Sequence, residues 1–142
     1  GETQPLFVFH HGAGQSALSF ALTARELRQR TNNQCAIACY DCRGHGKCND
    51  DLTRTANDND LSLARLTQDL VEVVRQVQQH PKQSIILVGH SMGGAVVVDA
   101  VARKLIAPMT GVVVLDVVEG SAMESLAYMS AFIQSRPVAF HS

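Results

Sequence analysis

The 142-residue sequence lacks any block of one charge and any long apolar run. Its 12 Lys and Arg residues nearly balance 13 Asp and Glu residues, which gives a net charge of −1, and the basic residues form no stripe. A nucleic-acid-binding domain or a protein that docks on an anionic membrane normally carries such a stripe. The longest apolar runs, such as SIILV and GVVVL, are far shorter than the roughly 20 residues of a membrane-spanning helix. We therefore expect neither nucleic acid nor membrane as a partner.

The first residues also lack the basic-then-apolar pattern of a secretory signal peptide. The composition is that of an ordinary globular protein, with 46% hydrophobic and 18% charged residues. A length of 142 residues suits one domain with a sizeable core. These features favour a single cytosolic or nuclear domain.

Metal-binding patterns are weak. Four cysteines lie within residues 35–48, and the Cys39-x-x-Cys42 spacing raises the possibility of zinc. In a strand these two side chains would point to opposite faces, and no second pair completes four ligands. A better explanation is that the four cysteines are small apolar residues that pack in the core of a protein from a reducing compartment. The acidic segment 49–60 lacks the spacing of an EF-hand, so we expect a solvated loop there. The sequence predicts no metal and no organic cofactor.

Continuous apolar runs alternate with segments of helical periodicity. Strands are expected at 5–14 (running into a glycine-rich loop), 35–41, 84–89 and 110–116. Helices are expected at 16–30, 63–77, 93–106 and 121–136, the last with Ser121 and Glu124 as a capping box. Continuously apolar strands, each followed by a helix, indicate a parallel sheet covered on both faces. The predicted fold class is therefore α/β.

Residues 89–93, GHSMG, fit the G-x-S-x-G pattern of a nucleophile elbow. A serine in a sharp strand-to-helix turn needs small neighbours, and glycine stands two residues away on either side. Such a turn lifts the Ser91 hydroxyl out of the sheet and places it beside the positive end of a helix. The alternative is a glycine-rich helix start kept for packing alone. The predicted strand-turn-helix context favours Ser91 as a nucleophile.

The segment HHGAG, which follows the first strand, is a candidate for half of an oxyanion hole. Acyl transfer generates an oxyanion that needs backbone N–H donors already in place. Met92, the residue after the nucleophile, would supply one amide, and Ala13 in the glycine-rich loop would supply the other. The alternative is a plain turn at a strand end. His11 is interpreted as a residue that structures this loop rather than as the catalytic base.

Asp116 is the favoured acid. It ends the apolar run GVVVLD, so it should emerge at the same edge of the sheet as Ser91, and it follows the serine in sequence. Asp41 also ends a strand but precedes the serine, and a role in bracing a loop suits it better. Glu119 is the third candidate.

The base has no good candidate. The histidines of the sequence are His10, His11, His45, His80, His90 and His141. The triad order Ser, Asp, His requires a base after the acid, and only His141 follows Asp116. No further strand is predicted between Asp116 and His141 that would carry His141 to the site, and the His90 side chain cannot turn back onto the adjacent Ser91. The catalytic histidine is expected outside this sequence.

Four segments in order, HHGAGQSALSF, DCRGHG, ILVGHSMGGAVVV and LDVVEGSAMESL, closely resemble the protein phosphatase methylesterase family. The resemblance extends through nearly the whole sequence, and DVVEGSAM together with SALSF is its most specific part. It implies an α/β-hydrolase fold and a serine esterase that removes the methyl ester from the C-terminal leucine of the type 2A protein phosphatase catalytic subunit. It also implies Ser91 as nucleophile, Asp116 as acid and residues 12–14 as oxyanion loop, with Ala13 where glycine is more usual.

The resemblance also bears on domain organisation. Residues 1–142 correspond to an incomplete α/β-hydrolase domain without its leading and final strands, and residues 121–142 to the start of a helical insertion that helps to engage the phosphatase. The family's catalytic histidine lies beyond that insertion. We therefore expect these 142 residues alone to be a poor catalyst, since triad members act as a unit. Two other hypotheses stay open: an α/β-hydrolase esterase with a different substrate, and a non-catalytic fragment that binds the phosphatase.

Overall fold

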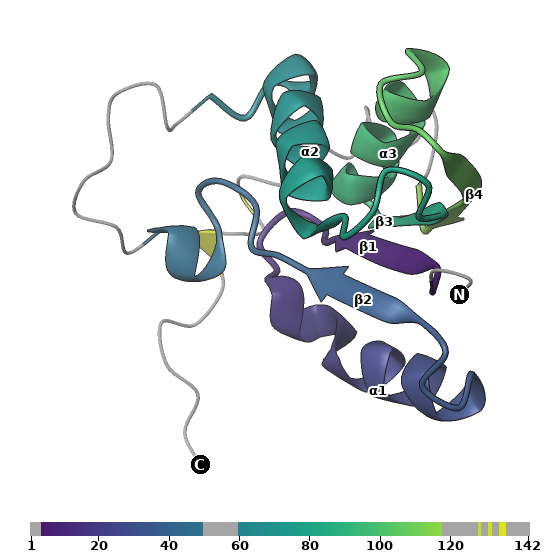
Figure 1. The fold of residues 1–142 in the computed structure, drawn as a ribbon. Coiled ribbons are helices and arrows are strands. Elements are labelled where there is room, and N and C mark those ends of the chain that lie inside the picture. The colour runs from purple at the N-terminus through teal and green to yellow at the C-terminus, as the bar shows by residue number, and fades with distance from the viewer. Residues whose placement is uncertain (1–3, 50–59, 118–127, 129–130, 132–133, 136–142) are drawn as a thin grey trace.

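The computed structural model describes residues 4–49, 60–117, 128, 131, 134 and 135. Its elements are β1 (Leu6–His10), η1 (Ala17–Phe20), α1 (Ala21–Arg30), β2 (Ala36–Cys39), η2 (Gly46–Asn49), α2 (Leu63–Val77), β3 (Ile85–His90), α3 (Met92–Ala102) and β4 (Met109–Leu115). The four strands form one parallel sheet in the order β2-β1-β3-β4 (Figure 1). The predicted α/β class is confirmed, and so is the order of strands and helices from β1 to β4.

The sheet divides the core into two layers because successive side chains of a strand point to opposite faces. On one face, Leu6, Val8 and Leu87 pack against apolar side chains of α2 and α3. On the other face, Phe9 and Val88 pack against Phe20 of η1, and α1 lies beyond (Figure 1). The helices therefore cover both faces, as the continuously apolar strands predict.

Helix α3 ends four residues earlier than the predicted helix 93–106. The N–H of Leu105 donates to Ala100 O at 3.0 Å, and that of Lys104 donates to Val101 O at 2.9 Å. Lys104 has a φ of 53°, so the end has the geometry of a Schellman motif with lysine in the left-handed position. The prediction was wrong here because glycine usually marks that position, and lysine gives no stop signal.

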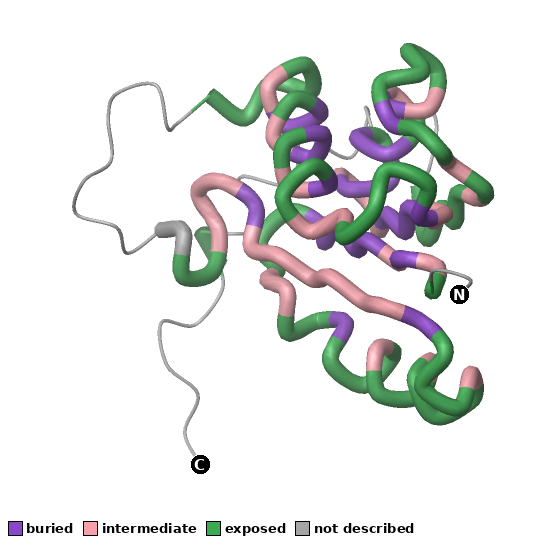
Figure 2. The backbone as a smooth tube through the Cα atoms, in the orientation of Figure 1, coloured by how far each residue is buried: buried purple, intermediate pink, exposed green. Residues whose placement is uncertain are grey.

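Strand β4 is the least covered part of the sheet. Its residues 112–115 are each about two-fifths exposed, whereas β1 and β3 are largely buried (Figure 2). Among the described residues, β4 pairs only with β3. Among the described elements, β4 is thus an edge strand of the sheet and the one with the most exposed apolar side chains.

Several predicted features lie outside the described residues. They are most of the loop 49–60, Glu119, His141, and most of the predicted helix 121–136, of which Tyr128, Ala131 and Gln134 are described and helical. Among the helices that are described, none has both the length and the apolar character needed to span a bilayer.

Candidate active site

Ser91 lies in a tight turn between the end of β3 and the start of α3. Its backbone has φ 51° and ψ −118°, a conformation that non-glycine residues adopt rarely and at an energetic cost. The carbonyl of Ser91 accepts the N–H groups of Gly94 at 2.8 Å and Ala95 at 3.3 Å, which starts the helix directly after the serine. The strand-turn-helix context predicted for GHSMG is therefore present.

The elbow glycines are required by close backbone contacts. A β-carbon at Gly89 would lie 2.3 Å from Gly93 O, and a β-carbon at Gly93 would lie 2.2 Å from His10 O. Both distances are far shorter than any van der Waals contact. The turn at Ser91 can therefore form only where these two positions carry no side chain.

The Ser91 turn lies at a topological switch point of the sheet. The chain runs from β1 outward to β2, then crosses back so that β3 lies on the other side of β1. Ligands of open α/β sheets bind outside the carboxyl ends of strands at such a point. His10, the last residue of β1, is in register with Gly89 of β3, so the HHGAG loop and the elbow emerge side by side.

The loop after β1 packs directly on the elbow. A β-carbon added to Gly12 would lie 2.9 Å from His90 Nδ1 and 3.2 Å from Ser91 Cβ. Ala13, the next residue, is exposed, and Met92 occupies the first turn of α3. First-turn amides of a helix have no carbonyl partner within the helix, so the Met92 N–H is available to a ligand. The two amides predicted as oxyanion donors belong to segments that lie in contact.

His11 holds the loop in place through both ring nitrogens. Its Nε2 accepts the N–H of Cys42 at 3.0 Å, and its Nδ1 therefore carries the proton and donates to Gly12 O at 2.8 Å. Burial lowers the pKa of His11 because desolvation disfavours the charged ring. A fully engaged neutral imidazole fits the predicted loop-structuring role.

Asp41 braces the same region, as predicted for it. Its carboxylate accepts the N–H of Ala17 at 2.7 Å and that of Lys47 at 2.9 Å. These two backbone hydrogen bonds lower the pKa of Asp41. A β-carbon at Gly46, which has a φ of 51°, would overlap the carboxylate at 2.2 Å. Asp41 thereby ties the segment after the HHGAG loop to the loop after β2.

Asp116 lies at the end of β4, next to the elbow. The Ser91 N–H donates to Leu115 O at 2.9 Å, so the residue after Leu115 adjoins the serine. Asp116 has a φ of 51°, and its side chain is 77% exposed. Its Oδ2 is 3.8 Å from His90 Nε2. The carboxylate is thus at the same edge of the sheet as Ser91 and open to a further partner.

In the part of the chain that the structure describes, no histidine forms a hydrogen bond with Ser91. His10 is 1% exposed and uses Nδ1 on His11 O, and His80 follows α2, at the opposite edge of the sheet from the elbow. His141 lies outside the described residues. The described geometry contains the serine and an acid without a base between them.

The described residues contain no group of three or more His, Cys, Asp or Glu side chains that could hold a metal ion. Cys35, Cys39 and Cys42 are free thiols. Cys42 is buried beside His45, whose Nδ1 lies 3.3 Å from its sulfur.

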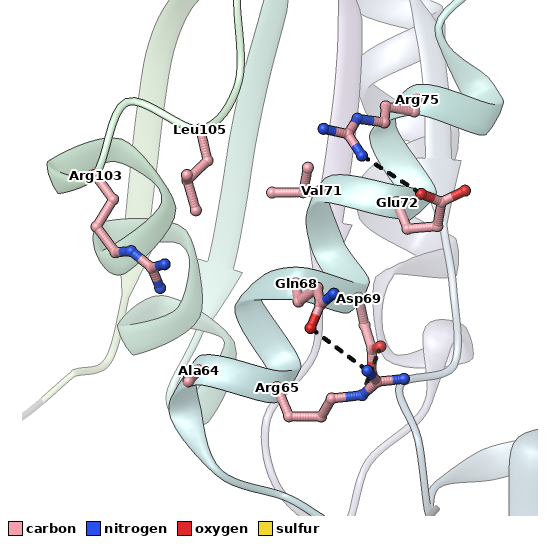
Figure 3. A pocket seen from close by; sticks show the side chains of 9 residues that line it. All are labelled: Ala64, Arg65, Gln68, Asp69, Val71, Glu72, Arg75, Arg103 and Leu105. Atoms are coloured by element: carbon pink, nitrogen blue, oxygen red, sulfur yellow. Dashed lines mark hydrogen bonds and ion pairs between the residues drawn. The ribbon is translucent and has the colours of Figure 1, made fainter.

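A hollow lies between α2 and the end of α3. It encloses about 530 Å³ (Figure 3) and is lined by Ala64, Arg65, Gln68, Asp69, Val71, Glu72, Arg75, Arg103 and Leu105. Each arginine is paired with an acid: Arg65 with Asp69 at 3.4 Å, Arg75 with Glu72 at 3.7 Å, and Arg103 with Asp99 at 3.2 Å. The hollow includes no residue of the elbow or of the HHGAG loop.

The sequence model of the alpha/beta hydrolase family matches residues 7–141. The chain belongs to the alpha/beta hydrolase family. Among solved structures, this chain is similar to a marine microorganism esterase, with a TM-score of 0.67 and 22% identity over 96% of this chain and 49% of the esterase. At that identity the likeness supports the fold alone.

Curated relatives share more of the sequence of this chain. It is 40% identical over 139 residues to protein phosphatase methylesterase 1 of Schizosaccharomyces pombe, covering 96% of this chain and 39% of the relative. It is 44% identical over 142 residues to the protein of the same name from Cryptococcus neoformans, covering 95% and 32%. The resemblance to protein phosphatase methylesterases is confirmed, and the chain spans about a third of the length of these relatives.

Two residues of the candidate site were missed by sequence reasoning. Gln15 Oε1 lies 3.2 Å from the Gly12 N–H donor and 3.1 Å from His90 Nδ1, so it joins the HHGAG loop to the elbow. Gln15 carries no motif of its own. The place of His90 inside the elbow could have pointed to it as a site residue. Its hydrogen-bond partner Gln15, 75 residues earlier in the chain, could not have been found in this way.

Proposed function

We propose that this chain carries the nucleophile, the acid and the oxyanion hole of a serine carboxylesterase that removes methyl esters from a protein phosphatase. The observation that supports it most is the Ser91 turn, with φ 51° between β3 and α3, in contact with the glycine-rich loop after β1. A serine hydroxyl beside the backbone amides at a helix start is suited to acyl transfer.

In the first half of the reaction, Ser91 Oγ attacks the ester carbonyl while a base removes its proton. A bond forms between Oγ and the carbonyl carbon, and the negative charge passes to the carbonyl oxygen. The amides of Met92 and Ala13 stabilise that oxyanion. The protonated base then gives its proton to the methoxy oxygen, so methanol leaves and an acyl-serine remains.

In the second half, water attacks the acyl-serine and the same base takes the water proton. Collapse of the second tetrahedral intermediate releases the carboxylic acid and restores the Ser91 hydroxyl. Asp116 orients the base and stabilises its protonated form. We assign the base to a histidine outside these 142 residues, because none in the described part bonds to Ser91.

For the substrate, we propose the methyl ester of the C-terminal leucine of the type 2A phosphatase catalytic subunit. The support is the name of the relatives at 40% and 44% identity, protein phosphatase methylesterase 1, together with the family resemblance of the sequence.

The test is hydrolysis of a synthetic peptide ending in leucine methyl ester by the natural polypeptide that carries this sequence. Methanol release is compared among the wild type, Ser91→Ala and Asp116→Asn, with p-nitrophenyl acetate as a generic ester. We expect each substitution to lower kcat by about 10⁴-fold or more, because triad members act as a unit. Asp41→Asn serves as the matched control, since Asp41 braces a loop and should cost far less.

Retained hydrolysis in Ser91→Ala would overturn the proposed nucleophile. A wild-type polypeptide that hydrolyses p-nitrophenyl acetate through Ser91 but leaves the leucine methyl ester peptide intact would overturn the substrate and favour another esterase of this fold. A wild-type polypeptide inactive on both esters would favour the non-catalytic, phosphatase-binding alternative.

A further inference from the structure

Gln15 accepts two hydrogen bonds with one oxygen, and these bonds determine the tautomer of His90. The Gly12 N–H donates to Gln15 Oε1 at 3.2 Å, which identifies that atom as the oxygen because a backbone N–H can only donate. His90 Nδ1 lies 3.1 Å from the same oxygen. Nδ1 must therefore carry the proton and donate. The Gln15 N–H in turn donates to Gly12 O at 3.2 Å, so Gln15 and Gly12 hold each other at both ends.

This bridge joins the two segments that contain the proposed oxyanion donors. At one end, Gln15 accepts a hydrogen bond from Gly12, which directly precedes Ala13. At the other end, it accepts a hydrogen bond from His90, two residues before Met92. The bridge spans a contact with no spare room, since a β-carbon at Gly12 would lie 2.9 Å from His90 Nδ1. Any change in the bridge would alter the separation between the Ala13 and Met92 amides.

The second nitrogen of His90 faces the proposed acid. His90 Nε2 is 3.8 Å from Asp116 Oδ2, beyond a normal hydrogen bond. At this distance Nε2 makes no hydrogen bond with the carboxylate, while the proton on Nδ1 is donated to Gln15. The Asp116 side chain, 77% exposed, stays open to the base that the mechanism requires. The same Gln15 contact therefore bears on both the oxyanion hole and the acid.

We propose that His90 and Gln15 are positioning residues that set the spacing of the two oxyanion-hole amides. This inference rests on the proposed function only in requiring Ser91 as nucleophile, and it is independent of which ester is the substrate. Neither side chain needs to touch the reacting atoms. Their effect should therefore fall on kcat, which reports stabilisation of the transition state, and much less on KM.

The experiment uses the natural polypeptide with p-nitrophenyl acetate and compares variants that break or keep the bridge. Gln15→Met and His90→Leu remove the hydrogen bond at similar side-chain size. Gln15→Glu keeps an oxygen acceptor, and His90→Asn keeps a donor near the place of Nδ1. In the first two variants we expect kcat to fall about 10- to 100-fold while KM stays within about twofold of the wild-type value. This fall in kcat is smaller than the one expected for complete removal of an oxyanion-hole donor, because the amides would be displaced and not lost. The second two should recover most of that rate.

A double variant tests the shared bridge. Gln15→Met with His90→Leu should lose no more activity than His90→Leu alone, because either change already breaks the same contact. Additive losses, or an unchanged kcat in both single variants, would overturn the inference. Ser91→Ala distinguishes its failure from failure of the proposed function: if that variant is inactive while the bridge variants are normal, only the bridge is wrong. Equal unfolding temperatures of Gln15→Met and Gln15→Glu exclude a folding defect as the cause.

Discussion

At the scale of single residues, His10 is a buried histidine that the proposed chemistry does not use. It ends β1, is 1% exposed, and its ring packs edge-on against Tyr40 at a centroid distance of 5.3 Å. The pKa of His10 is lowered from 6.5 to about 4, chiefly because burial disfavours the charged ring, and the hydrogen bond to His11 O offsets only part of that effect. The folded protein therefore holds His10 neutral at pH values where the unfolded chain protonates it.

This difference predicts how stability depends on pH. The unfolded state binds the extra proton between pH 6.5 and about 4, so the free energy of unfolding should fall as pH falls through that window. Between pH 7 and pH 5 the loss from His10 is about 2 kcal/mol. Urea unfolding at the two pH values measures it, and His10→Phe, which keeps an aromatic ring against Tyr40, should reduce the difference by that amount.

Because the difference between pH 7 and pH 5 is taken separately for each protein, a change in overall stability caused by the substitution cancels. An equal pH dependence in the wild type and His10→Phe would contradict the assignment. NMR titration of the His10 ring provides a second measurement, which should show no protonation at pH 5.5.

Residue roles differed in how far the sequence could predict them. Loop-structuring by His11 and bracing by Asp41 were predicted, because both residues lie at strand ends where loops converge. The position of Asp116 beside the Ser91 turn was also predicted, while its catalytic role stays a prediction. The Gln15–His90 contact could not be predicted, since it depends on two parallel strands bringing distant segments together.

At the scale of elements, α3 must approach β1 closely for the Ser91 turn to form. A β-carbon at Gly93 would lie 2.2 Å from His10 O, a backbone atom in a central strand that cannot move aside. We predict that Gly93→Ala costs at least about 2 kcal/mol in the free energy of unfolding, as expected for overpacking. Thermal or urea unfolding measures it.

Gly111→Ala is the matched control. Its added β-carbon would lie 3.7 Å from two carbons of Ile86, an ordinary contact, so stability should change by less than about 0.5 kcal/mol. Equal effects of the two substitutions would show that the helix does not approach the strand as closely as described.

Helix ends show where sequence patterns suffice and where they fail. After α1, Asn32 and Asn33 have φ values of 49° and 59°, and asparagine tolerates that region, so the predicted end at Arg30 is confirmed. After α3, lysine occupies the equivalent position and the predicted end was too late. The α3 end is made by local backbone hydrogen bonds, but lysine in the left-handed position is not a residue type that sequence patterns associate with a helix end.

At the scale of the whole molecule, β4 presents an apolar surface that the described residues leave uncovered. Val113 is in register with Val88, so it points to the α1 side of the sheet, and it is 42% exposed. Apolar edge strands of this kind tend to pair with other chains. We predict that the 142-residue polypeptide self-associates as its concentration rises, and that Val113→Lys reduces this association.

Sedimentation velocity over a range of concentrations measures the effect. Lysine at an exposed edge can extend into solvent, so Val113→Lys should leave the unfolding temperature nearly unchanged. A wild-type polypeptide that stays monomeric at every concentration would contradict the prediction.

The central claim, that Ser91 is the nucleophile, is tested most directly by covalent labelling. A fluorophosphonate reacts only with an activated serine, and the label is located by mass spectrometry of tryptic peptides from the natural polypeptide. The account predicts one adduct, on Ser91 within the peptide 83–103, and none in Ser91→Ala. A polypeptide that hydrolyses esters while its label falls on another residue would contradict it.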